Sequence, residues 1–192
     1  MGAKQAVHLN NYADLDEAIS DKAPPADIVN IMLVGRVSPQ KDPQFLLDTI
    51  SSLKAYPEHN NIKLHWLGGG DPEMERALRE AGVDVSGMIP HAELMAKLKG
   101  ADLYLHTAAW EGMPLTILEA ARLRIPMILR IIGATQNLHY PFLVSSPDTM
   151  AKQIVNFCRT PGHPDYQTAI DTFNREFSAE KQREALHLIY GS

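Results

Sequence analysis

The sequence predicts an α/β fold built on a doubly wound parallel sheet of about six strands. Short apolar runs that are typical of buried strands alternate with stretches in which apolar residues recur at helical spacing. Glycines and prolines stand at many of the boundaries between these segments, where they end one element and begin the next. Strands that alternate with helices form right-handed βαβ units, and such units place their strands side by side in one parallel sheet.

The expected strands are short and mostly apolar. They span residues 29–34, 62–67, 83–89, 102–106, 126–132 and 142–144. A further short strand is expected at residues 6–9, ahead of a polar, proline-containing linker at 21–27. We therefore expect three parts: a linker region with the first short strand at 1–27, a ligand-binding domain at 28–175 and a C-terminal helix at 176–192.

The expected helices carry start and stop signals at their ends. They span residues 45–53, 73–81, 91–98, 115–123, 149–159, 165–173 and 179–189. Asp42 and Pro43 fit the N-cap and the first position of the first helix, whereas Gly82 ends the second. Pro114 fits the first turn of the helix that starts near Leu115, where its missing N–H costs little.

Composition excludes several classes of protein. The formal net charge of −5 gives no basic surface for a nucleic acid. The single Cys158 rules out an intramolecular disulfide and suits a reducing compartment, so we expect a cytoplasmic protein. No apolar run approaches the length of a transmembrane helix, and the N-terminus does not have the pattern of a signal peptide.

Four loops at the carboxyl ends of the expected strands carry the candidate ligand-binding residues, because ligands bind at this edge of an open parallel sheet. The loops contain Gly35, Arg36 and Lys41; Gly68 to Gly70; Glu111 to Thr116; and Gly133 to Thr135. Arg36 and Lys41 suit a diphosphate, since a guanidinium binds phosphate oxygens in a fixed fork and an ammonium acts as a mobile charge. The alternative is that both are ordinary solvated cations.

The glycine loop at residues 68–70 lets the backbone turn tightly and approach a ligand closely. It is neither a Gly-x-Gly-x-x-Gly sequence nor a Walker loop, so the sequence does not favour a dinucleotide or ATP.

Glu111 precedes the helix that starts near Leu115, and Glu119 lies about one turn into it. The backbone N–H groups at this helix start can bind an anion such as a phosphate; they belong to Gly112, Met113, Leu115 and Thr116. Carboxylates accept hydrogen bonds from sugar hydroxyls. The loops together suit an anionic, polyhydroxylated ligand such as a nucleoside-diphosphate sugar. The alternative is that both glutamates are ordinary helix charges.

These motifs, in this order and spacing, resemble the donor-binding C-terminal domain of GT-B fold retaining glycosyltransferases of family 4, the glycosyl transferases group 1. The motifs are Val34-Gly35-Arg36 with Lys41-Asp42, Leu67-Gly68-Gly69-Gly70, and Glu111-Gly112-Met113-Pro114-Leu115 with Glu119-Ala120. The likeness runs from about Ala6 to the C-terminus. It implies a Rossmann-like domain that forms the C-terminal half of a GT-B fold.

The resemblance also implies roles for the candidate residues. Arg36 and Lys41 would hold the donor diphosphate, Glu111 would orient the transferred sugar without acting as a nucleophile, and Glu119 would bind the ribose. The glycines Gly35 and Gly68 and the main chain around Ile89 would complete the donor site. The N–H groups near Gly112, Met113, Leu115 and Thr116 would contact the sugar and the phosphates. The family needs no metal or other cofactor.

Enzymes of this family are two-domain proteins, so the resemblance implies an N-terminal acceptor domain as partner and predicts that this chain is a fragment of a longer enzyme. In the family, peripheral contact with the inner face of the membrane is usually made through that other half.

Three positions depart from the family pattern: Ala108, Arg124 and Asn137. Two other interpretations stay open, a non-catalytic sugar-nucleotide-binding module and a GT-B-like sugar-nucleotide 2-epimerase.

Several remaining residues have structural interpretations. His65, His91 and His106 lack the spacing of metal ligands, and we interpret them as structural. Trp110 fits either the donor pocket or packing against another domain. Asp14 and Asp16 suit the start of a helix better than a metal site.

Overall fold

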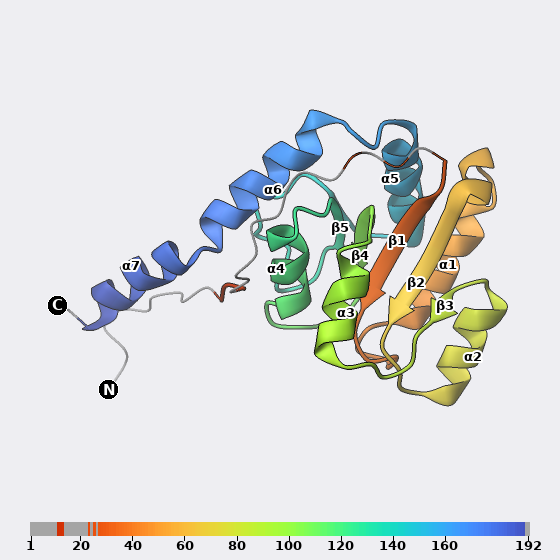
Figure 1. Ribbon diagram of the computed structural model, residues 1–192, viewed down its shortest axis with the longest axis horizontal. Helices are drawn as coiled ribbons and strands as arrows, with labels where there is room; N and C mark the ends of the chain where they lie inside the picture. Colours follow the sequence, from red (N-terminus) through yellow and green to blue (C-terminus); the bar gives the residue numbers. More distant parts are fainter. Residues whose placement is uncertain (1–10, 14–22, 24, 26, 191–192) are drawn as a thin grey trace.

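The computed structural model describes residues 11–13, 23, 25 and 27–190, and its core is a six-stranded parallel sheet (Figure 1). The strands are β1 (Val29–Val34), β2 (Ile62–Leu67), β3 (Asp84–Val85), β4 (Leu103–His106), β5 (Met127–Arg130) and β6 (Leu143–Val144). Their order across the sheet is β3-β2-β1-β4-β5-β6. The predicted doubly wound parallel sheet of about six strands is confirmed.

The strand order reverses between β1 and β4, which lie side by side with Ile31 opposite Leu103. From β1 the chain winds to β2 and β3 on one side, and it then returns to β4 and winds to β5 and β6 on the other. The loops after β1 and β4 therefore leave the sheet in opposite directions from adjacent strand ends. Such a switch point opens a crevice in which ligands of α/β proteins bind.

Helices cover both faces of the sheet (Figure 1). They are α1 (Pro43–Leu53), α2 (Pro72–Glu80), α3 (His91–Leu98), α4 (Leu115–Arg122), α5 (Pro147–Arg159), α6 (Pro164–Glu176) and α7 (Ala179–Tyr190), and a 3-10 helix, η1, spans Pro57–Asn61. Side chains of α1, α2 and α5 form one apolar cluster against the sheet, and side chains of α3, α4 and α6 form the other. The chain thus has a three-layer α/β/α architecture.

Strand β1 shows why the sequence carries continuous apolar runs. Ile31 and Leu33 belong to the cluster on one face, and Met32 and Val34 belong to the cluster on the other. Successive side chains of a strand point to opposite faces, so a strand covered on both faces needs an apolar residue at every position.

Prolines move most helix starts to earlier positions than the apolar spacing predicts. Helices α1, α2, α5 and α6 begin at a proline that occupies N1 or N2, where its missing N–H is no loss. Asp42 is the N-cap of α1, as predicted, and its carboxylate accepts from the Phe45 N–H at 3.2 Å. The expected first-turn position of Pro114 is wrong: Pro114 has extended backbone angles and is the N-cap of α4. Proline has no side-chain acceptor, so no side chain caps this helix start.

Two predicted strands are shorter than their apolar runs. The run at 83–89 pairs in parallel only over Asp84–Val85, and Gly87, with a φ of 70°, forms an isolated antiparallel bridge with Gly68 instead. The run at 126–132 pairs over Met127–Arg130, between β4 and the short edge strand β6.

At the C-terminal end, α6 continues into α7, which extends away from the sheet and has no buried residue (Figure 1). This helix agrees with the one predicted at 179–189 to within a residue. The strand predicted at 6–9 and the helix start near Asp14 and Asp16 lie outside the described residues. Within the described part of the chain, none of the helices has both the length and the apolar character of a membrane span.

Candidate functional site

The loop after β1 is shaped around Gly35, which has a φ of 143°. A Cβ atom at Gly35 would lie 2.5 Å from Lys41 Cε, so the lysine stem crosses directly over this glycine. The Gly35 N–H donates to Leu67 O at 3.1 Å, and Trp66 Nε1 donates to Gly35 O at 2.8 Å. The backbone conformation favours glycine here, and a larger residue would also displace the flexible end of the Lys41 side chain.

The glycines of the loop after β2 pack against the loop after β1. A Cβ atom at Gly68 would lie 2.2 Å from Gly35 O, and one at Gly70 would lie 2.1 Å from Val37 O. The Val37 N–H donates to Gly69 O at 3.1 Å. Within the protein, Gly68 and Gly70 lie closest to the loop after β1, and Gly69 lies closest to Met88 and Gly87 in the loop after β3. Gly68 and Gly70 fix the position of the loop that carries Arg36 and Lys41.

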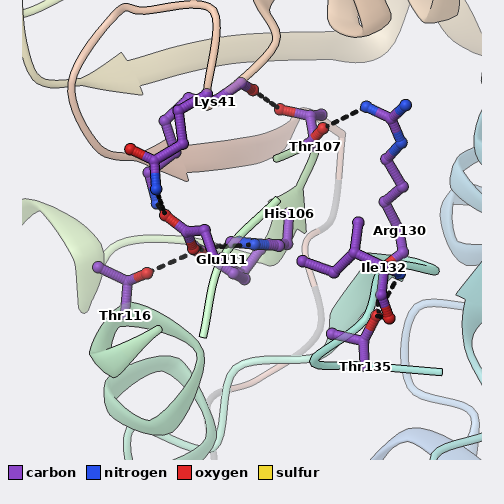
Figure 2. A network of polar contacts seen from close by, with 10 residues as sticks. Lys41, His106, Thr107, Glu111, Thr116, Arg130, Ile132 and Thr135 are labelled. Atoms are coloured by element: carbon purple, nitrogen blue, oxygen red, sulfur yellow. Dashed lines mark hydrogen bonds and ion pairs between the residues drawn. The ribbon is translucent and has the colours of Figure 1, made fainter. Parts of the chain in front are cut away.

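Glu111 lies between Lys41 and His106 (Figure 2). Lys41 Nζ forms an ion pair with Glu111 Oε1, and His106 Nε2 lies 3.3 Å from Glu111 Oε2. The Lys41 and Glu111 side chains are only 14% and 10% exposed, and the His106 side chain is 2% exposed. The three side chains come from the loop after β1, the loop after β4 and the end of β4, so the fold brings both sides of the switch point together.

The neighbours of Glu111 favour its ionised form. Burial raises the pKa of the Glu111 carboxyl, but the protonated form of His106 and the Lys41 ammonium lower it by more, so the pKa lies below its ordinary value. The pKa of His106 is also lowered, first by burial, which disfavours the imidazolium, and then by the Lys41 charge, against the opposing effect of Glu111. A carboxylate beside a neutral imidazole is therefore the state at neutral pH.

Tyr104, two residues before His106, connects this group to helix α4. Its hydroxyl donates to Thr116 Oγ1 at 3.0 Å and lies 3.2 Å from His106 Nδ1. Burial raises the pKa of Tyr104, and the charges of Glu111 and Glu119 raise it further, so both carboxylates act on this buried hydroxyl. Tyr104 and His106 point to the same side of β4 because side chains alternate along a strand.

Glu119 lies on α4 against the loop after β3. Its Oε1 is 3.1 Å from Nε2 of His91, the first residue of α3, and its side chain is 14% exposed. Ile89 belongs to the loop that leads into α3, so the fold brings Glu119 close to the segment predicted to face the base.

Arg36 lines a pocket of about 550 Å³ together with Ser38, Pro39, Gln40 and Trp110. The arginine is exposed, and no carboxylate in the described part of the chain lies within ion-pair distance of it. Gln40 Nε2 lies 3.5 Å from Glu111 Oε1, so the pocket adjoins the Lys41–Glu111 pair. The sequence left Trp110 open between the donor pocket and domain packing, and in the structure its side chain lines this pocket.

Arg130, at the end of β5, is a supporting residue that the sequence reasoning missed (Figure 2). Its Nη1 donates to Asp42 Oδ2 at 2.6 Å and to Thr107 O at 2.9 Å, and its guanidinium lies 4.2 Å from the centre of the Phe45 ring. Thr107 Oγ1 in turn donates to Lys41 O at 2.9 Å. Arg130 and Thr107 thus tie Lys41 O and the Asp42 carboxylate, in the loop after β1, to the loop after β4 that carries Glu111.

The remaining predicted donor residues lie around the start of α4. Gly112 is exposed, the Leu115 side chain is 55% exposed, and Met113 packs partly against the apolar cluster of α3, α4 and α6. Thr116 bonds Tyr104 through its side chain. Among the residues that the structure describes, no group of three or more His, Cys, Asp or Glu side chains is arranged to hold a metal ion.

Comparison with known proteins identifies the family. The family described as glycosyl transferases group 1 matches residues 29–160, which is more than half of the chain. The chain belongs to this family. Its fold is that of the C-terminal domain of GT-B glycosyltransferases.

Known relatives of this group 1 domain are longer proteins. The chain is 28% identical over 173 residues to TuaC of Bacillus subtilis (strain 168), which is named as a teichuronic acid biosynthesis glycosyltransferase. This match covers 86% of the chain and 43% of TuaC. The crystal structure of TarM superimposes with a TM-score of 0.77 at 16% identity, over 96% of this chain and 39% of TarM. A structure of an S. aureus TarM variant in complex with Fondaparinux, alpha-GlcNAc-glycerol and UDP superimposes with a TM-score of 0.78.

A third likeness is to OtsA, the trehalose-6-phosphate synthase, with a TM-score of 0.69 at 16% identity, over 85% of this chain and 43% of OtsA. At such identities the likeness concerns the fold. The chain spans about two fifths of the length of these proteins.

One departure from the family pattern has a visible structural setting. Arg124 stands where the resemblance implies glycine, and it has a φ of 56°, in the left-handed region that glycine adopts most readily. Its Nη1 donates to Asp171 on α6 at 2.7 Å. Ala108 is fully buried and Asn137 is exposed.

Proposed function

We propose that the chain is the donor domain of a retaining glycosyltransferase. It binds a nucleoside-diphosphate sugar and, with an N-terminal acceptor domain, transfers the sugar to an acceptor with retention of configuration. The observation that carries this proposal is that Arg36, Lys41 and Glu111 lie around the switch point of the sheet, at the start of a helix that no side chain caps.

The diphosphate is assigned to the two cations. Arg36 is exposed in a pocket large enough for a ligand, and a guanidinium binds two phosphate oxygens at once. Lys41 lies beside the same pocket and can leave Glu111 for a stronger anion. Together they would stabilise the charge that develops on the leaving nucleoside diphosphate, so we expect transfer without a divalent metal or other cofactor.

The two glutamates are assigned to the two sugars of the donor. Glu111 would accept a hydroxyl hydrogen bond from the transferred sugar and orient it. Glu119 would accept from the ribose, with the main chain around Ile89 facing the base; the short distance between Glu119 and His91 supports this arrangement. Backbone N–H groups at Gly112, Met113, Leu115 and Thr116 would complete the anion site at the start of α4.

The relatives support the class of donor and the setting. The TarM variant was solved in complex with UDP, and the name of TuaC refers to the biosynthesis of teichuronic acid. We propose a role in the assembly of a cell-surface polysaccharide.

Calorimetric titration of the chain with UDP, GDP and ADP tests the donor site. We expect one of the three to bind, and Arg36→Ala and Glu119→Ala each to weaken that binding by roughly tenfold or more, because a hydrogen bond to a charged group contributes about 1.5–3 kcal/mol.

Arg76→Ala and Glu80→Ala are the matched controls. Both residues are exposed on α2, paired with one another at 4.0 Å, and should leave nucleotide affinity unchanged. The proposal would be contradicted by the absence of binding of all three nucleotides at millimolar concentration, or by equal losses in the control variants.

A further inference from the structure

We propose that His106 is a positioning residue for Glu111. When the donor diphosphate draws Lys41 away from Glu111 Oε1, His106 takes up a proton from solvent and holds Glu111 Oε2, which leaves Oε1 free to accept from a sugar hydroxyl. The inference deepens the proposed function and rests on it.

The geometry shows a contact that is not yet a hydrogen bond. His106 Nε2 and Glu111 Oε2 lie 3.3 Å apart, both atoms are buried, and neither has a hydrogen-bond partner. Two buried polar atoms that face one another without a hydrogen bond are unusual, since an unsatisfied buried group is destabilising. A hydrogen on Nε2 that pointed at Oε2 would satisfy both.

The other side of the imidazole indicates which ring nitrogen carries the hydrogen of the neutral form. The Tyr104 hydroxyl donates its one hydrogen to Thr116 Oγ1, so towards His106 it can only accept. Nδ1 must therefore carry the hydrogen of the neutral ring. Nε2 then presents a lone pair to Glu111 Oε2, and only the doubly protonated ring can donate to both Tyr104 and Glu111.

The charges around His106 set its response to a ligand. Glu111 faces it from the loop after β4, and Lys41 reaches the same carboxylate from the loop after β1. On β5, the cation Arg130 is paired with Asp42. On α4, Thr116 is neutral, and the Glu119 charge acts on Tyr104. Lys41 is therefore the cation that opposes protonation of His106.

Donor binding should shift the protonation equilibrium of His106 towards its charged form. In the free chain, burial and Lys41 keep the pKa of His106 below its ordinary value. A bound diphosphate would remove Lys41 from Glu111 and add negative charge nearby, and both effects raise the pKa of His106. The bound state then holds more protons than the free state, so donor affinity rises as pH falls through this window.

The test measures proton uptake during calorimetric titration at pH about 6 to 7, where an imidazole changes charge. The titrants are UDP-glucose, GDP-glucose and ADP-glucose, because the terminal phosphate of a free nucleoside diphosphate itself titrates near pH 6. Titrations in buffers of different ionisation enthalpy give the number of protons taken up. We expect the wild-type chain to take up a large fraction of one proton.

Two substitutions separate positioning from packing. His106→Gln keeps an N–H donor that does not titrate, so it should bind within about threefold of wild type with no proton uptake. His106→Leu fills the space without a donor and should bind at least tenfold more weakly. The control His65→Gln changes a histidine of β2 that pairs with Asp84 on the edge strand β3. This variant should keep the proton uptake of the wild type.

The outcomes are distinguishable. Binding without proton uptake, uptake that persists in His106→Gln, or full affinity in His106→Leu would overturn the inference and leave the donor-domain proposal intact. No binding of any of the three sugar nucleotides would overturn both. Thermal unfolding of each variant checks that it is folded at the temperature of the titration.

Discussion

Lys41 and Glu111 form an ion pair across the switch point of the sheet, between the loop after β1 and the loop after β4. The pair holds the candidate catalytic carboxylate in place. It also occupies the oxygen that a sugar hydroxyl would need. We therefore expect ligand binding at this site to involve an exchange of partners.

Gly68→Ala should destabilise the fold strongly. A Cβ atom there would lie 2.2 Å from Gly35 O, and Gly68 has a φ of 143°. The backbone must shift, and we expect a loss of about 2–3 kcal/mol in the free energy of unfolding, measured by urea titration. Gly133→Ala is the control, because its Cβ would have no neighbour within 4 Å and should change stability by less than about 1 kcal/mol. Equal effects of the two substitutions would refute this account of the loop.

Arg130→Met should loosen the Lys41 loop. The substitution leaves Asp42 Oδ2 and Thr107 O without their donor and removes the contact with the Phe45 ring. We expect a loss of about 2 kcal/mol of stability and a weaker affinity for the nucleotide that binds the wild type. Arg76→Met, on the exposed face of α2, should change neither. A variant that loses stability but keeps full affinity would show that Arg130 does not position Lys41.

The stability of the ligand-free chain should fall as pH drops below about 6.5, the ordinary pKa of histidine. His106 has a lowered pKa in the folded state, so the unfolded chain binds a proton first and the stabilisation is lost as pH falls towards the folded pKa. His106→Gln should reduce this loss, as measured by urea unfolding from pH 8 to pH 5, whereas His59→Gln in η1 should not. An unchanged pH profile in His106→Gln would contradict a depressed pKa for His106.

Tyr104→Phe should change the tautomer of His106. Without the hydroxyl that accepts from Nδ1, the neutral ring can carry its hydrogen on Nε2 and donate to Glu111 Oε2. Nitrogen-15 chemical shifts of the imidazole report this change, and proton uptake on donor binding should decrease. We also expect a loss of about 1–2 kcal/mol from the broken bond to Thr116. Tyr56→Phe, for which no such bond is seen, serves as the control for both measurements.

Local signals explain which parts of the fold were predictable. Strand β1 is apolar at every position except Asn30 because both of its faces are buried, and this is visible in the sequence alone. The start of α1 at Asp42 and Pro43 is equally local, since a capping carboxylate and a proline act on the next few residues. Pro114 was assigned to the wrong side of its helix start because a proline fits both the N-cap and the first turn.

The candidate site likewise contains residues that the sequence indicates and residues that only the structure reveals. Arg36, Lys41, Glu111 and Glu119 could be named in advance because their residue types and loop positions already indicate binding of an anion and a sugar. His106 and Arg130 could not, because each acts through a partner on another element. His106 reads as one polar residue in a buried strand, and only the position of Glu111 gives it a role.

The sequence by itself determined the parallel α/β fold, the edge of the sheet where the candidate residues lie, and membership of a glycosyltransferase family. These depend on periodicity, capping and motif spacing, which are properties of neighbouring residues. Tertiary structure decided which charges meet: the pairing of Lys41 with Glu111, the contact of His106 with the same carboxylate, and the bonds from Arg130 to Asp42 and Thr107. Those contacts join residues from different strand ends, and the packing of the sheet alone sets the distances between them.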